Sequence, residues 1–148
     1  MMQPNEEDFD HNLIPEDKLA ILNIKVNKAH RKESDWDVIK DILKEYRIIT
    51  TETMTNVPGI RVIDHVLCRN GALFVFTNAE DCKDYINSIA KTVGSEGLYF
   101  NIGSMAFEEV VDIADREHMD IYIDAKHEKN HRFIRYRWQD KTLAVAMF

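Results

Sequence analysis

The segment from residue 69 to 90 most tightly constrains the fold of this chain of 148 residues. Asn70-Gly71 stands between two apolar runs and is typical of a type I′ hairpin turn, because both central residues of that turn need positive φ. Segment 72–76 is apolar throughout and predicts a strand buried on both faces. An amphipathic helix is expected next, with its apolar stripe at Cys82, Tyr85, Ile86 and Ile89. Together these residues predict a hairpin, a central strand and a helix that covers it.

The residues before this segment predict two helices and a first strand. Pro15 suits the first turn of a helix, and the two acids after it favour the positive end of that helix. Apolar residues recur at helical spacing in two groups, Leu19, Leu22, Val26 and Ala29, then Ile39, Ile42, Leu43 and Tyr46. A short polar link joins the groups, so we expect a helical hairpin. Segment 47–51 is the first expected strand, and segment 60–68 is the second, paired with 72–76.

The second half of the chain adds strands and one more amphipathic helix. Segments 98–102 and 121–123 are expected strands. The stripe of the helix between them comprises Phe107, Val110, Val111 and Ala114. Segments 133–138 and 143–148 predict a closing hairpin. Because a strand–helix–strand crossover normally places its strands parallel, the sequence predicts an α/β (α+β) fold: a mixed sheet with helices packed on it, two N-terminal helices and a C-terminal β-hairpin.

Helix ends are predicted from residues that can bond the free backbone groups there. The expected N-caps are Ser34, Thr77 and Ser104, and the expected C-cap is Gly94. Ser34 and Thr77 each have an acid three residues later, which is the spacing of a capping box.

Composition bounds the size and compartment of the protein. One domain is expected over residues 15–148, after a flexible acidic leader over 1–14. Apolar residues make up 45% of the chain and charged residues 30%, as in folded globular proteins. Neither a membrane-spanning run nor a secretory signal is recognisable. Cys68 and Cys82 resemble small buried hydrophobic residues, so we expect reduced thiols and a cytoplasmic location.

Charge is unevenly distributed along the chain, whose formal net charge is −7. This charge argues against general nucleic-acid binding, because a phosphate backbone needs a basic surface. Acids crowd the start, at Glu6, Glu7, Asp8, Asp10, Glu16 and Asp17, and bases crowd the end, at Lys126, Lys129, Arg132, Arg135, Arg137 and Lys141. Two interpretations stay open: the two ends are separately solvated, or they attract each other within one chain or between two.

Residues 73–81 carry a resemblance to a known family. They read Leu-Phe-Val-Phe-Thr-Asn-Ala-Glu-Asp, a strand that runs into a helix. With the two helices and strand before it, this segment resembles the "lPvFTs-eea" region in the N-terminal domain of the SseB family, named for enhanced serine sensitivity. Residues 100–103, Phe-Asn-Ile-Gly, stand where that family has an "iNP"-like turn, without its usual proline. The resemblance covers residues 15–125 and implies the fold and a regulatory or binding role, with no established enzymatic chemistry.

Segment 127–131 matches the H-E-x-x-H pattern of zinc peptidases. On a helix this spacing puts His127 and His131 on one face for Zn²⁺, with Glu128 as the general base. A helix here would have no apolar stripe to bury it, because its neighbours are Lys126, Lys129, Asn130 and Arg132. We therefore expect a polar loop without a metal, and we keep a metal-dependent hydrolase as the alternative.

The end of the chain interleaves arginines with aromatic residues. Alternation along a strand would place Arg135 and Arg137 on the face opposite Trp138. The residues Arg135, Arg137 and Trp138 can form an interaction surface for an acidic or nucleic-acid partner. In the other interpretation, the arginines keep an exposed strand from edge aggregation, and the net negative charge favours this second view.

These patterns favour binding over catalysis. Since no nucleophile–base set can be assembled from the sequence, we expect a non-catalytic regulatory or protein-interaction domain with no cofactor and an unspecified protein partner. The alternatives are the hydrolase and a self-associating scaffold. In the scaffold, the last strand pairs between two copies into a homodimer, because an uncovered edge offers free N–H and C=O groups.

Overall fold

The computed structural model describes residues 13–93, 98–126 and 128–148. Within them the helices are α2 (Glu16–Asn27), α3 (Glu33–Glu45), α4 (Ala79–Val93) and α5 (Phe107–Glu117). The strands are β1 (Arg47–Met54), β2 (Ile60–Ile63), β3 (Val66–Arg69), β4 (Ala72–Val75), β5 (Phe100–Ala106), β6 (Asp120–Ile123), β7 (Arg132–Arg137) and β8 (Thr142–Met147). The expected leader up to residue 12 and the expected cap Gly94 lie outside the described residues.

Six strands form a mixed sheet in the order β2-β3-β4-β6-β7-β8. β4 and β6 are parallel, with Leu73 opposite Ile121, and the other neighbouring pairs in this sheet are antiparallel. β7 and β8 form the predicted closing hairpin, in which Ile134 lies opposite Val145. With helices packed on the mixed sheet, the predicted α+β fold class is confirmed.

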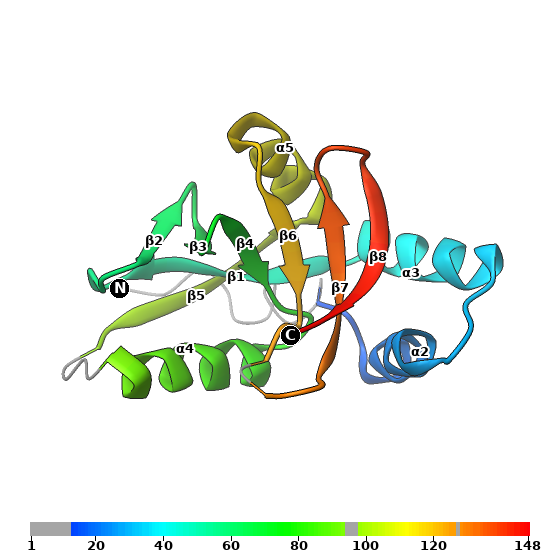
Figure 1. Ribbon diagram of the computed structural model, residues 1–148, viewed down its shortest axis with the longest axis horizontal. Helices are drawn as coiled ribbons and strands as arrows, with labels where there is room; N and C mark the ends of the chain where they lie inside the picture. Colours follow the sequence, from blue (N-terminus) through cyan, green and yellow to red (C-terminus); the bar gives the residue numbers. More distant parts are fainter. Residues whose placement is uncertain (1–12, 94–97, 127) are drawn as a thin grey trace.

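β1 and β5 pair antiparallel in a second sheet, and in Figure 1 both strands cross behind the larger sheet. Ile49 joins the two sheets to each other. Its N–H donates to the carbonyl O of Phe76 at 2.7 Å, and its own carbonyl O accepts the N–H of Phe76 at 3.0 Å. The strand predicted over 98–102 overlaps β5. Because β5 pairs with β1 outside the larger sheet, the strand that runs parallel to β4 is β6.

Hydrophobic side chains pack on both faces of the larger sheet. Alternation along β4 sends Leu73 and Val75 to one face and Phe74 to the other. The first face is covered by α2, α3 and α5, and the second by α4. The predicted stripe of α4 is buried as expected, at Cys82, Tyr85, Ile86 and Ile89. Phe74 and Phe76 are buried in the same cluster as Ile86, which confirms the predicted central strand.

Two tight turns need backbone conformations with positive φ. Asn70 and Gly71 have φ of +54° and +75° between β3 and β4, which confirms the predicted hairpin. The prediction of one continuous strand over 60–68 is wrong. Asp64 and His65, at φ of +46° and +67°, reverse the chain and divide the segment into β2 and β3. Both are residue types enriched in this conformation, so the signal was present in the sequence.

The start of α4 differs from its prediction by one residue. Thr77 does not cap the helix, because both its N–H and its hydroxyl donate to the carboxylate of Asp124, at 2.8 and 2.6 Å. Asn78 takes that role, since its Oδ1 accepts the N–H of Asp81 at 2.9 Å. The two hydrogen bonds of Thr77 to Asp124 instead link the end of β4 to the end of β6.

The other two predicted N-caps are also displaced. Ser104 lies within β5, where its hydroxyl accepts a hydrogen bond from Nε of Arg47 at 2.9 Å, so α5 begins only at Phe107. Ser34 lies inside α3, whose first turn is closed by Asp35: its Oδ2 accepts the N–H of Lys32 at 2.8 Å. Asp35 thus replaces Ser34 at the start of α3, whereas α5 begins without a side-chain cap.

Candidate functional site

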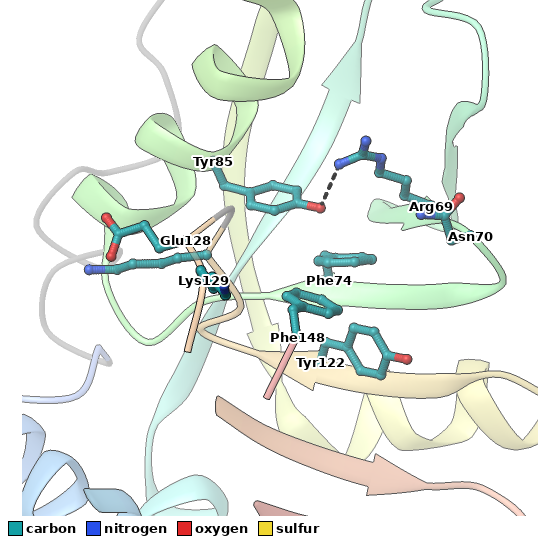
Figure 2. A pocket seen from close by; sticks show the side chains of 9 residues that line it. Arg69, Asn70, Phe74, Tyr85, Tyr122, Glu128, Lys129 and Phe148 are labelled. Atoms are coloured by element: carbon teal, nitrogen blue, oxygen red, sulfur yellow. Dashed lines mark hydrogen bonds between the residues drawn. The ribbon is translucent and has the colours of Figure 1, made fainter. Parts of the chain in front are cut away.

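A cavity of about 390 Å³ opens on the α4 side of the larger sheet, and we call it the aromatic pocket. Its lining residues are Arg69, Asn70, Phe74, Tyr85, Tyr122, Lys126, Glu128, Lys129 and Phe148. They come from β3, the β3–β4 turn, β4, α4, β6, the segment after β6 and the residue after β8. In Figure 2 the four rings lie together, with Arg69 on one side of them and Glu128 and Lys129 on the other. The volume is within the range of pockets that hold small ligands or inserted side chains.

Four rings form the floor and mouth of the aromatic pocket. Phe74 stacks on Tyr85, with ring centroids 5.0 Å apart, and meets Tyr122 edge-on at 5.2 Å. Phe74 and Tyr122 are neighbours because the register of β4 and β6 pairs them. Phe148 contacts Tyr122 at 5.8 Å, yet its side chain is 56% exposed. An exposed ring beside a buried aromatic floor offers apolar surface that a bound group can cover.

Arg69 and Tyr85 supply polar groups at one end of the pocket. Nη1 of Arg69 donates to the hydroxyl O of Tyr85 at 3.2 Å (Figure 2). No carboxylate oxygen of the described residues lies within 4.0 Å of the Arg69 guanidinium. Burial raises the pKa of Tyr85, so its hydroxyl keeps its proton at neutral pH and can still donate it. This pair can therefore bind an anion.

The other end of the pocket carries two lysines and a glutamate. Nζ of Lys126 lies 3.6 Å from Oδ1 of Asp81, and Lys129 is exposed. Glu128 is the one carboxylate among the described lining residues, against the three cations Arg69, Lys126 and Lys129. The rim of the pocket is thus positive in a chain whose net charge is −7.

A second cavity, of about 330 Å³, lies where β4 and β6 end. Asp124 lines it and accepts both hydrogen bonds of Thr77. Burial raises the pKa of Asp124 to about 6, although the hydrogen bonds from Thr77 oppose the rise. Nε2 of His131 lies 2.9 Å from the carbonyl O of Asp124 and donates to it. These contacts fasten the ends of β4 and β6 to the start of β7.

The residues of the H-E-x-x-H match do not share one cavity. Glu128 lines the aromatic pocket, and His131 lines the second cavity. Residues 128–130 form a bend and a turn, so the helix that the zinc pattern requires is absent over them. His127 lies outside the described residues. Within the described ranges, no group of three or more His, Cys, Asp or Glu side chains is arranged to hold a metal ion.

The interaction surface predicted at Arg135, Arg137 and Trp138 lies on β7 and just after it. Arg135 bonds to Asp120 through both Nε and Nη2, at 2.7 and 2.6 Å. Arg137 pairs with Asp140 at 3.3 Å, and the ring of Trp138 stacks on that of His118 at 4.5 Å. All three side chains therefore already have partners within the chain.

Both cysteines are free and buried, as the sequence predicted. Sγ of Cys82 lies 3.7 Å from the hydroxyl O of Thr51, and burial raises the pKa of this thiol to about 11. Since the thiolate is the reactive form, Cys82 is an inert core residue.

Sequence reasoning did not bring Arg69, Tyr122 and Phe148 together in one pocket. Arg69 directly precedes the Asn70-Gly71 turn, and Tyr122 alternates between two apolar residues, so each had a local structural explanation. The pocket arises because β4 and β6 are neighbours in the sheet, although 44 or more residues separate them in the sequence. Their register places Phe74 opposite Tyr122. That pairing has no signal in local spacing.

The described residues thus form an α+β protein with an aromatic pocket that has a positive rim. None of the described helices is long and apolar enough to cross a bilayer. Comparisons with protein-family models, with curated proteins and with solved structures found no match for the chain. The resemblance of residues 73–81 to the SseB family therefore stays a prediction from the sequence.

Proposed function

We propose that this protein is a non-catalytic protein-interaction domain that binds a segment of a partner protein in the aromatic pocket. The observation that carries the proposal is the exposed ring of Phe148 beside the buried rings of Phe74 and Tyr85. Aromatic-lined grooves with polar groups at their ends are suited to extended peptide segments. We further propose a regulatory role, which is what the resemblance to SseB domains implies, and a cytoplasmic location, which the two free cysteines favour.

The chemistry of the pocket supports binding over the hydrolase alternative. Among its described lining residues, Glu128 is the only carboxylate, and His131 lies in the other cavity. The lining residues include neither cysteine, and the Tyr85 hydroxyl is held protonated by burial. A nucleophile with an adjacent base is therefore missing from the described lining, whereas apolar surface and hydrogen-bond donors are present.

Selection from a random peptide library tests this function. Peptides selected on the wild-type protein are expected to bind Phe148→Ala at least roughly tenfold more weakly, because the exposed ring supplies apolar contact. Tyr99→Ala is the matched control, since Tyr99 is 81% exposed and does not line the pocket. Affinities would be measured by isothermal titration. Selected peptides that bind wild type and Phe148→Ala equally would contradict the proposal, as would a selection that enriches no peptide.

Self-association is a second candidate function, favoured by the position of β8. This strand is the last in the order of the six-stranded sheet, and among the described residues it pairs with β7 alone. A free strand edge can add a second copy of the same chain, and a two-fold pair is the common closed form. Its residue Met147 is 55% exposed and would add apolar contact.

A homodimer is expected at micromolar concentration if β8 pairs between copies. Light scattering on the full chain would then give twice the monomer mass, and Met147→Lys would shift the mass toward the monomer. Ile24→Lys, at a residue of α2 that is 64% exposed, is the matched control and should leave the mass unchanged. A wild-type monomer at about 100 µM, far above a typical working dissociation constant, would show that the idea is wrong.

A further inference from the structure

Among the described residues, the cation Arg69 at the rim of the aromatic pocket has no carboxylate partner, whereas Lys126 pairs with Asp81. Three other arginines pair with carboxylates: Arg116 with Asp64, Arg135 with Asp120, and Arg137 with Asp140. Arg69 instead makes one described side-chain hydrogen bond, to the uncharged hydroxyl of Tyr85. A guanidinium has five N–H donors in a fixed plane, and carboxylates are the groups that match it best. The pocket is therefore suited to an acidic occupant.

The positions of the cations indicate how such an occupant is arranged. Figure 2 shows Arg69 at one side of the aromatic floor and Lys129 at the other, with the rings of Phe74 and Phe148 between them. A segment that crosses the pocket would therefore place an apolar or aromatic side chain over the rings. Acidic side chains on both flanks of that residue would then face the cations.

The chain itself contains a segment with this pattern. Residues 6–10 read Glu-Glu-Asp-Phe-Asp, so that Phe9 has carboxylates on both sides. The described chain begins at Leu13, which packs against the hydrophobic cluster that includes Phe74 and Tyr85. Four residues of extended chain reach at most about 14 Å, so Phe9 is held within that distance of Leu13. The acidic segment is thus joined through two residues to Leu13, which contacts the same hydrophobic cluster that contains Phe74 and Tyr85.

We propose that residues 6–10 bind in the aromatic pocket of their own chain, with Phe9 against the exposed ring of Phe148 and the flanking acids toward Arg69 and Lys129. This inference rests on the proposed function of the pocket as a binding site. It adds that the chain carries its own competitor, which a partner must displace. A tethered segment competes at a high effective concentration, so even a weak contact lowers the apparent affinity of a partner.

Nuclear magnetic resonance of the full chain labelled with ¹⁵N tests this contact. Phe9→Ala is expected to shift the amide signals of Arg69, Asn70, Tyr85 and Phe148, because the pocket loses its occupant. Met2→Ala, which removes an apolar side chain outside the acidic segment, is the matched control and should leave those signals in place. Identical pocket signals in wild type and Phe9→Ala would overturn the proposal.

A charge variant and a synthetic peptide complete the test. Arg69→Gln is expected to weaken the contact. In this background, adding Phe9→Ala should therefore shift the pocket signals much less than it does in wild type. Arg61→Gln, at an exposed arginine of β2, is the control and should leave the effect of Phe9→Ala unchanged. A synthetic peptide of residues 4–12 should return the signals of Phe9→Ala toward their wild-type positions, and the same peptide with alanine for Phe9 should not. Failure of the peptide to do so would count against the proposal.

Protein concentration and the peptide selection separate the remaining explanations. Wild-type pocket signals are expected to stay constant over a roughly tenfold range of protein concentration, because the contact is intramolecular. Signals that move with concentration would identify a second copy as the source of the segment and overturn the proposal. If Phe9→Ala changes nothing while library peptides still lose affinity for Phe148→Ala, the proposed function stands and only the competing segment is wrong.

Discussion

Phe74→Ala is expected to lower the free energy of unfolding by about 3–5 kcal/mol. Phe74 is only 2% exposed and contacts both Tyr85 and Tyr122, so its truncation removes buried apolar contacts and leaves a void beneath the aromatic pocket. A domain is stable by roughly 5–15 kcal/mol, so this single change removes a large share. We expect a protein that is unfolded or melts many degrees lower, as measured by thermal denaturation followed with circular dichroism.

The control for this variant is Tyr99→Ala. Tyr99 is 81% exposed, and substitutions at such surface positions usually change stability by no more than about 0.5 kcal/mol. A Phe74→Ala melting curve that overlays the wild-type curve would contradict the burial of β4 between its two hydrophobic clusters.

Stability is expected to fall as the pH rises through the titration of Asp124. Burial raises the pKa of this carboxyl from its ordinary value of 3.8 to about 6. Between these two pH values the folded state holds the proton and the unfolded state releases it. The contribution of Asp124 to the free energy of unfolding is therefore greatest below pH 3.8 and is lost as the pH rises through about 6. The loss is at most about 3 kcal/mol.

Asp124→Asn isolates this contribution from the other titrating groups. The amide does not ionise, and it can still accept the N–H of Thr77 while its NH₂ donates to the Thr77 hydroxyl. The melting temperature of the variant, relative to wild type, is expected to be higher at about pH 7.5 than at about pH 4.5. Asp84→Asn, at an exposed carboxylate of α4, should show no such trend. A temperature difference for Asp124→Asn that stays constant over this range would refute the prediction.

Much of the local structure could be predicted because its causes lie within a few residues. The Asn70-Gly71 turn needs positive φ, and the stripe of α4 needs helical spacing; both requirements are visible in short windows of sequence. The cap of α4 was missed by one residue, because Thr77 bonds to Asp124, which is 47 residues away. A separation of 57 residues likewise hides from local reasoning the bond between Arg47 in β1 and Ser104 in β5.

The strand order and the pocket could not be predicted for the same physical reason. Which strands become neighbours depends on how the faces of the sheets and helices pack together. The spacing of apolar residues along the sequence does not by itself encode the order of the strands. Segment 98–102 has the composition of a strand in either sheet, so only packing decides that β5 pairs with β1. Tyr122 and Phe148 meet because β6 and β8 lie on either side of β7 in one sheet, and the two rings line a pocket only once that sheet has formed.

The placement of the two hydrophobic clusters on opposite faces of one sheet bears on how this protein can diverge. Tyr122 and Phe148 lie on the α4 face, whereas the side chains that hold α2, α3 and α5 face the other way. Substitutions at sites without shared contacts combine nearly additively in stability. The exposed ring of Phe148 can thus change over generations, while the buried rings of Phe74 and Tyr85 and the opposite cluster keep the fold. Among descendants of this chain, we expect Phe148 to vary sooner than these buried residues.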